Sequence, residues 1–338
     1  MILTHILSFV IFPIIVLWKI TFEDRDDILD RQDTNVLKGI AAMCIVFAHF
    51  YNALLIEDIG IGKLWLYTGG IGVCIFFFLS GYGLNISKSY EKSDFMIRRI
   101  KGVMIPFIIM RIPYFFVYYP LGTKSVGYFF GYLLGIFEPQ WFVSVIIIIY
   151  IGYYICYRSF GKRWLNISVC IYNIILGILF YVLNMNERWY NAHLLFSIGM
   201  LVADYNADIV KWLKKRNWWL VNLSLGTVFL FSSVIFTLNK GNLVSIMFKI
   251  IAGIGISMLF YNLLLKIRLN SRILQWIGKN SLLVYIIHLQ FLAMQDRIAI
   301  IPISLFTLSG VVITFLYIVV YNICEKKIVE WNRGKKTK

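Results

Sequence analysis

Two histidines lie deep inside stretches of sequence that are apolar enough to cross a membrane. His49 lies in residues 35–56, eleven residues after Lys38, and His288 lies eleven residues after Ile277. At 1.5 Å of helical rise per residue, each histidine is ~16 Å along its helix, near the middle of a ~30 Å hydrocarbon core. Ionisable groups at that depth are costly and usually functional. An imidazole there could act as a general base or as a nucleophile.

A third ionisable group at similar depth is Arg111, about nine residues into its own apolar stretch. We expect Arg111, His49 and His288 to face a common polar cavity. The alternative is that each one only hydrogen-bonds neighbouring helices, because polar side chains join helices within membranes. Three ionisable groups at matched depth favour a functional role, whereas His193 and Lys249 are better explained as structural groups.

A cluster of basic residues lies just before the stretch that contains Arg111. In FMIRRIKGVMIPF, the residues Arg98, Arg99 and Lys101 precede Pro106. The cluster can be a topology signal, or a cationic seat for a phosphorylated ligand, because guanidinium groups match phosphate oxygens. Without further context the topology signal is favoured.

The composition excludes most classes of soluble protein. Of the 338 residues, 60% are hydrophobic, and the mean hydropathy is +0.76, whereas soluble domains are about half apolar. Apolar blocks of spanning length recur throughout, without the alternation of a transmembrane barrel. The net charge of +16 sits in short loops, where basic residues set topology, and does not indicate nucleic acid. The cysteines form no CxxC pair, so we expect no disulfide framework and no metal site.

The chain is therefore predicted to be an all-α polytopic membrane protein with about eleven transmembrane helices. Residues 125–138 are glycine-broken and short for a span. The predicted spans are 2–20, 36–55, 64–86, 102–119, 141–157, 164–183, 192–204, 217–238, 243–265, 277–297 and 300–323.

The orientation follows from the lysines and arginines between these spans. If residues 125–138 do not cross, 25 of the 33 basic residues lie on one side and five on the other. Basic residues concentrate on the cytoplasmic side. The pattern predicts a multi-pass protein of the cell membrane with its N-terminus outside and its C-terminus in the cytoplasm. Residues 125–138 are then interfacial or re-entrant.

The order of motifs resembles the membrane-bound acyltransferase 3 family, whose bacterial members O-acetylate cell-surface glycans. Five motifs carry the resemblance, which covers about residues 34–323: Lys38-x10-His49, the run from Phe76 to Ser80-Gly81, the basic cluster before Pro106, Trp141-Phe142, and Asn280-Ser281 followed by Tyr285-x-x-His288. The resemblance implies a ten-helix membrane domain at 34–323. Residues 1–33 are then an extra N-terminal helix with a cytoplasmic linker, and residues 324–338 a basic cytoplasmic tail.

The same resemblance implies a donor, an acceptor and a set of site residues. The donor is an acyl-CoA, with acetyl-CoA expected, and no cofactor is permanently bound. The acceptor is a hydroxyl of a cell-surface or lipid-linked glycan. The phosphates of the donor would contact Lys38, Arg98, Arg99 and Lys101. His49 would act as a general base or as an acyl carrier, and both roles stay open. Charge on the thioester oxygen would be stabilised by His288, Tyr285 or Arg111.

Two other functions fit the composition. A transporter or flippase of a glycan or small molecule also has many spans and buried charges, although no paired broken helices are visible in corresponding halves. A scaffold that has lost its chemistry is the third reading. It rests on two departures from the family pattern. Lys38 replaces the usual arginine before the histidine. The family's RxxR motif is imperfect in the basic cluster: if it starts at Arg98, its second basic residue is Lys101, and if it starts at Arg99, the second basic residue is lost at Gly102.

Overall fold

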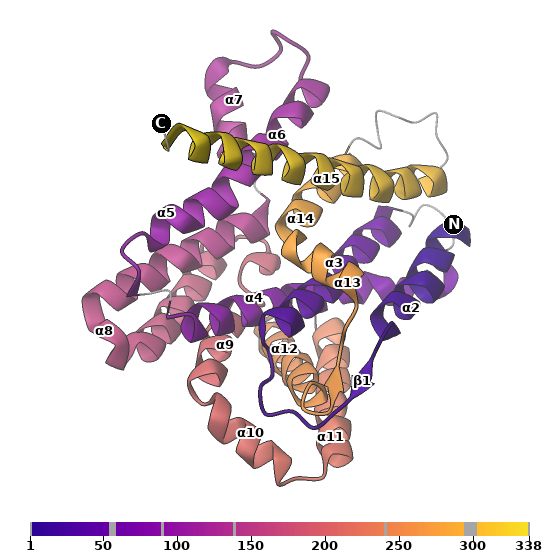
Figure 1. Cartoon of the computed structure of the whole chain (residues 1–338), viewed down its shortest axis with the longest axis vertical. Coiled ribbons are helices and arrows are strands. Elements are labelled where there is room, and N and C mark those ends of the chain that lie inside the picture. The colour runs from indigo at the N-terminus through magenta and orange to yellow at the C-terminus, as the bar shows by residue number, and fades with distance from the viewer. Residues whose placement is uncertain are drawn as a thin grey trace.

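The computed structural model describes residues 2–53, 59–88, 91–137, 140–239, 242–293 and 303–336 (Figure 1). Helices dominate these residues. The only strands among them are β1 (Thr21–Phe22) and β2 (Ile267–Arg268), which pair antiparallel. Within the ranges just given, seven helical stretches are long and apolar enough to cross a membrane, and three shorter apolar helices accompany them. The predicted all-α polytopic membrane protein is confirmed.

Each predicted span overlaps helices of the described chain. Two spans lie in one element, and the span 277–297 is divided between α13 (Arg272–Lys279) and α14 (Ser281–Ala293). Residues 54–55, 294–297 and 300–302 of the predicted spans lie outside the described residues. Helix α8 (Trp141–Val182) runs for 42 residues, but Gly161 at φ 68° and ψ −178° breaks its helical path. Tyr172 of the second arm donates a hydrogen bond of 3.0 Å to the carbonyl of Ile148 in the first. The two arms are therefore packed neighbours, corresponding to the predicted spans 141–157 and 164–183.

Three helices form the centre of the molecule: α3 (Arg31–Ala53), α4 (Thr68–Ile86) and α9 (Leu195–Asp204). A Cβ atom at Gly81 of α4 would collide with the backbone of Phe196, and one at Gly199 of α9 with the backbone of Phe78. Small residues let membrane helices approach this closely. Gly81 and Gly199 thus serve helix packing.

Helix α13 (Arg272–Lys279) positions the second histidine-bearing helix against the first. Ser271 caps it by accepting a hydrogen bond of 3.4 Å from the amide of Leu274, and such caps stabilise helix starts. A Cβ atom at Gly278 would fall on the carbonyl oxygen of Asn35 in α3. Helix α14 (Ser281–Ala293) follows directly, so it begins beside α3 (Figure 1).

The basic cluster begins a bent helical unit. Helix α5 (Phe95–Arg99) continues through a π-helical turn, η4 (Ile100–Met104), into α6 (Ile105–Tyr118). Helix α7 (Val126–Leu133) then packs back against α6. Its eight residues span ~12 Å, which is too short to cross a bilayer. The interfacial or re-entrant placement of residues 125–138 stays a prediction, and residue 138 lies outside the described chain.

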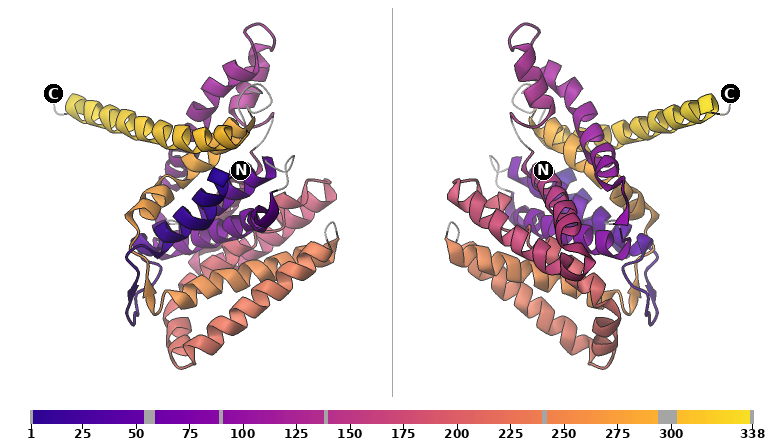
Figure 2. Two further views of the ribbon diagram at one scale, coloured as in Figure 1. Left: turned by 90° about the vertical axis from the view of Figure 1, so that its right-hand side faces the viewer. Right: turned by 90° about the vertical axis from the view of Figure 1, so that its left-hand side faces the viewer.

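The remaining helices surround this centre. Helices α11 and α12 lie side by side at one edge, and the end of α15 projects from the body (Figure 2). Helix α15 continues to Lys336, so most of the segment expected as a tail is helical. The remaining helices of the described chain are α1 (Ile2–His5), η1 (Ile6–Ile11), α2 (Phe12–Leu17), η2 (Gly60–Tyr67), η5 (Glu187–Trp189), α10 (Asn206–Lys214), α11 (Trp218–Leu238), α12 (Leu243–Leu263) and α15 (Ile303–Lys336).

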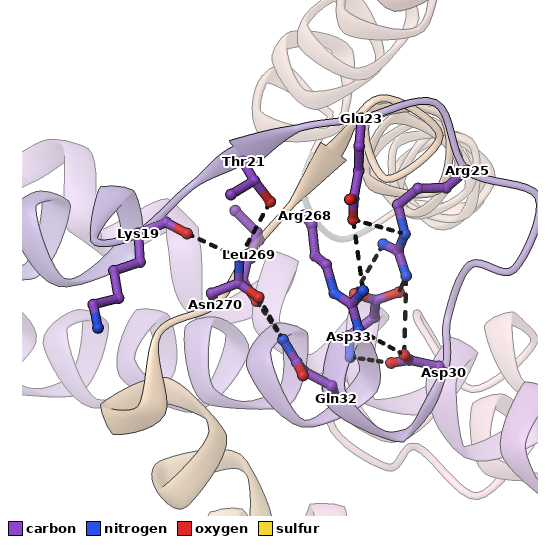
Figure 3. Close-up of polar contacts among 10 residues, drawn as sticks. All are labelled: Lys19, Thr21, Glu23, Arg25, Asp30, Gln32, Asp33, Arg268, Leu269 and Asn270. Carbon is purple, nitrogen blue, oxygen red and sulfur yellow. Dashed lines mark hydrogen bonds and ion pairs between the residues drawn. The ribbon is translucent and has the colours of Figure 1, made fainter.

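The linker between α2 and α3 is tied to the loop before α13 by a polar cluster (Figure 3). Arg25 donates two hydrogen bonds to the carboxylate of Asp33, at 3.1 and 2.8 Å. Both side chains are buried, Arg25 at 8% and Asp33 at 0% exposure. Burial opposes the charge of Arg25, but the hydrogen bond and charge of Asp33, helped by Asp30 and Glu23, raise its pKa above the ordinary value. The linker is therefore held firmly against the membrane domain.

Candidate active site

The two mid-depth histidines meet at the contact between α3 and α14. His49 Nδ1 and His288 Nε2 are 2.8 Å apart, and the rings are stacked with an interplanar angle of 15°. His288 is 1% exposed, and His49 is half-buried. The depth argument predicted a common position, and the structure brings these two residues into direct contact.

The hydrogen bonds of the pair assign its protons. His288 Nδ1 lies 2.7 Å from the carbonyl oxygen of Val284. A carbonyl only accepts, so His288 Nδ1 carries a proton. In a neutral ring the other nitrogen is then bare, so His288 Nε2 accepts a hydrogen bond from His49 Nδ1–H. By the same rule His49 Nε2 is bare, and it is the basic and nucleophilic atom of the pair.

Tyr285 lies one helical turn before His288 and is 6% exposed. Its ring packs edge-on to His288 at 6.0 Å and to Phe142 at 5.3 Å between centroids. Two predicted motifs, Trp141-Phe142 and Tyr285-x-x-His288, thus form one contact at the start of α8. Tyr285 therefore lies beside the histidine pair, and its predicted role in stabilising charge stays a prediction.

Arg111 has its described contacts in a different place from the histidines. Its guanidinium stacks on the ring of Tyr132 in α7, with 3.9 Å to the centroid, and donates to the carbonyl of Phe137 at 3.3 Å. These contacts stabilise the hairpin of α6 and α7. The described part of the structure does not bring Arg111 to His49 or His288.

A second arginine, which the sequence analysis did not single out, lies near the histidine pair. Arg188, in η5, is close enough for its charge to act on both His49 and Tyr285. Its side chain is exposed, on the side predicted to face outward. No motif drew attention to it. The only available signal was that it is one of the few basic residues on that side.

The residues of the basic cluster occupy two kinds of position: an inner one, partly buried in the protein, and an outer one, exposed at its surface. Arg99 is half-buried, its guanidinium lies 5.4 Å from the ring centroids of both Phe95 and Tyr150, and its charge acts on Lys38. Arg99 Nε is buried with no hydrogen-bond partner, and Lys38 has no acidic partner among the described residues. Two neighbouring cations with no acid beside them in the described chain are of the kind that binds anions, so the role of Lys38 and Arg99 as a phosphate seat stays a prediction.

Arg98 and Lys101 lie outside this inner pair. Both side chains are exposed, and Arg98 forms an ion pair with Asp94 one turn earlier. They stay candidates for the rim of a phosphate seat. The inner contact comes from Arg99 and Lys38, a combination that neither version of the RxxR motif predicted.

A small cavity borders the histidine pair between α3, α14 and α15. It is lined by residues that include Met43, Phe50, His288 and Phe315, and its volume is about 10 Å³, barely room for one water molecule. It touches His288 and not His49. A thioester that reaches His49 must therefore arrive by another path or after helices have moved.

The two groups expected to be structural have structural contacts. His193 lies with Nε2 at 2.6 Å from the carbonyl of Asn173 in α8, and with Nδ1 at 3.1 Å from the carbonyl of Tyr190. Lys249 places its ammonium 4.8 Å from the ring centroid of Phe236, in space left open by Gly70.

The comparison with protein families agrees with these motifs. The model of an acyltransferase domain, the one that defines the acyltransferase 3 family, matches residues 31–322. The match starts after the N-terminal helix and includes both histidines and the basic cluster. No curated protein and no solved structure matches the chain significantly. Because the matched segment is most of the sequence, the chain belongs to the acyltransferase 3 family.

Proposed function

We propose that the protein is an O-acyltransferase that moves an acyl group, expected to be acetyl, from cytoplasmic acyl-CoA to a hydroxyl of a cell-surface or lipid-linked glycan. The observation that carries the proposal is the His49–His288 pair, buried inside a multi-pass protein of an acyltransferase family. The family match favours group transfer over transport.

In this reaction His49 Nε2 takes the proton of the acceptor hydroxyl while the hydroxyl oxygen attacks the thioester carbonyl. A carbon–oxygen bond forms, the carbon–sulfur bond breaks, and the proton passes to the departing thiolate of CoA. His288 keeps His49 in the required tautomer and accepts a hydrogen bond from the transient imidazolium. Its role resembles that of the third member of a catalytic triad.

A carrier mechanism uses the same atoms in two steps. His49 Nε2 attacks the thioester and becomes acylated, CoA leaves, and the acceptor hydroxyl then takes the acyl group. Both mechanisms require His49 Nε2 to be bare and reachable. Rapid acid quenching with labelled acetyl-CoA separates them, because only the carrier mechanism leaves label on the protein.

The donor seat is expected to depend on Arg99 more than on Arg98. Arg99→Ala removes the inner guanidinium, and one charge-assisted hydrogen bond to phosphate contributes about 1.5–3 kcal/mol, so the KM for acetyl-CoA should rise ~10-fold or more. Arg98→Ala is the matched control, since Arg98 is exposed and paired with Asp94. Steady-state kinetics in nanodiscs measures both. Equal effects, or a change only in the acceptor KM, would contradict this seat.

His288 is expected to act as a positioning residue for His49. His288→Leu removes the acceptor of the 2.8 Å hydrogen bond, so kcat should fall ~10²-fold, within the range found for acid–base groups, while the donor KM changes little. His288→Gln offers an amide oxygen near the place of Nε2 and should retain more activity. If Leu and Gln behave alike and the pH profile of kcat is unchanged, His288 only fills space.

The activity itself is tested by acetyl transfer without an ion gradient. Purified protein in nanodiscs, acetyl-CoA labelled in the acetyl group and a surface-glycan extract should yield labelled glycan. Mass spectrometry of glycans from cells with and without the gene should show acetyl groups that depend on the gene. Glycans that keep every acetyl group without the gene, together with no transfer in vitro, would refute the proposed function.

A further inference from the structure

A cavity of about 310 Å³ lies where the N-terminal helix meets α13, within the size range of ligand pockets, about 300–1,000 Å³. Its walls are mainly apolar, and Ile14, Trp18 and Ile273 keep 52%, 59% and 54% of their surfaces exposed. Lys19 and Arg272 also line it. A tryptophan and basic side chains around an apolar opening are typical of the membrane–water interface.

The acids of the nearby linker leave these two cations without a partner. Salt bridges join Arg25, Lys214, Lys266 and Arg268 to the linker carboxylates. Lys19 and Arg272 are exposed, and in the described chain neither lies within salt-bridge distance of an acid. The cavity therefore has two cations at its edge, and the salt bridges of the linker use neither of them.

The backbone around the cavity is held in place. Lys19 has a φ of 58°, a left-handed conformation that lysine rarely adopts. Asn270 supports it by donating to the carbonyl of Lys19 at 3.0 Å and to Thr21 Oγ1 at 3.2 Å, while Gln32 donates to Asn270 Oδ1 at 2.7 Å. Figure 3 shows the Lys19 side chain turned away from the acidic cluster. Such strain persists only where the surrounding structure fixes it.

We propose that this cavity binds one anionic phospholipid of the inner leaflet. The headgroup phosphate would lie between Lys19 and Arg272, and an acyl chain would lie against Ile14, Trp18 and Ile273. The predicted topology puts this end of the helices at the cytoplasmic surface, where anionic lipids collect and basic pockets between helices bind headgroups. The residues that line this cavity include none of the proposed catalytic or donor-binding residues, and the proposal does not depend on the catalytic chemistry.

Native mass spectrometry of the full-length protein, titrated with phosphatidylglycerol and with phosphatidylcholine, tests this site. The wild type should bind its first phosphatidylglycerol more tightly than phosphatidylcholine. K19Q/R272Q should reduce that preference by about thirtyfold, since each basic residue near an anionic surface contributes about 1 kcal/mol. K211Q/K215Q is the matched control, because it removes two exposed positive charges in and directly after α10 and should keep the preference.

A second variant separates the apolar wall from the charges. Ile14→Trp narrows the opening from an exposed position and should weaken both lipids while leaving their ratio unchanged. Three results would overturn the site: a preference that survives K19Q/R272Q, an equal loss in the control, or displacement of the lipid by acetyl-CoA. The last result would identify the cavity as part of a donor site.

Discussion

His49→Ala is expected to abolish acyl transfer while the protein remains folded in the membrane. The substitution removes Nε2, the bare imidazole nitrogen that does not accept the hydrogen bond between the two rings, and with it the base or nucleophile of either mechanism. General acid–base groups contribute about 10²–10⁴ in rate, and an acyl carrier is indispensable to its pathway. The fall in kcat should therefore be at least ~10²-fold. It is measured as labelled acetyl transferred to glycan by equal amounts of purified protein.

The matched control is another histidine of the same chain. His5 lies in the N-terminal helix, before the family match begins, and Nδ1 of its ring is 3.1 Å from the hydroxyl of Tyr51. His5→Ala should retain most of the activity, because it leaves the pair intact. Full activity in His49→Ala would remove the proposed centre. Equal loss in both variants would point to a packing defect around α3.

The sequence predicted the depth of the histidines but not which helix faces they occupy. Counting residues from Lys38 in α3 and from Ile277, which lies near the end of α13, put both rings near mid-membrane, and the structure brings them together. The same count put Arg111 with them, yet its described contacts lie with α7. The depth of a side chain in the membrane follows from its residue number along the helix. The direction in which it points depends on the turn of about 100° between successive residues, and its neighbours depend on which helices pack there.

The choice between Arg98 and Arg99 could not be made for the same reason. Neighbouring residues on a helix point in directions about 100° apart, and the π-helical turn at Ile100–Met104 shifts the register further. Only the positions of Phe95, Tyr150 and Lys38 show that Arg99 is the inner residue. The order of motifs identified the basic cluster, but only the tertiary packing shows which of its residues is buried and which is exposed.

The sequence analysis did not predict the polar cluster that joins the linker to the loop before α13, here called the clamp, although the sequence contained a signal for it. Residues 23–33 hold six acids, and residues 266–272 hold three basic residues. Complementary blocks so far apart in sequence can be recognised, but nothing local shows that they meet. The strands that align them have two residues each, which is too short for any strand pattern.

That clamp carries the second large expected effect, in stability. Asp33→Leu should strongly destabilise the protein, because it leaves the guanidinium of Arg25 buried without its bidentate partner. Breaking a buried ion pair in this way costs about 3–5 kcal/mol. Glu23 and Asp30, each 3.9 Å from Arg25, are too distant to replace the two lost hydrogen bonds. Thermal unfolding of the detergent-solubilised protein, followed by circular dichroism, measures the effect.

Two further variants distinguish a charge effect from a packing effect. Arg25→Met combined with Asp33→Leu removes both buried charges and should recover most of the stability, as apolar replacements of buried pairs often do. Asp26→Asn breaks only the surface pair with Lys214, where exposed ion pairs are worth about 0–1 kcal/mol, and should change little.

Since Asp33 lies in the first turn of α3, one turn before Lys38, loosening it should also displace the donor seat relative to His49. A destabilised Asp33→Leu that the second substitution fails to rescue would show that Asp33 acts through α3 itself rather than through Arg25.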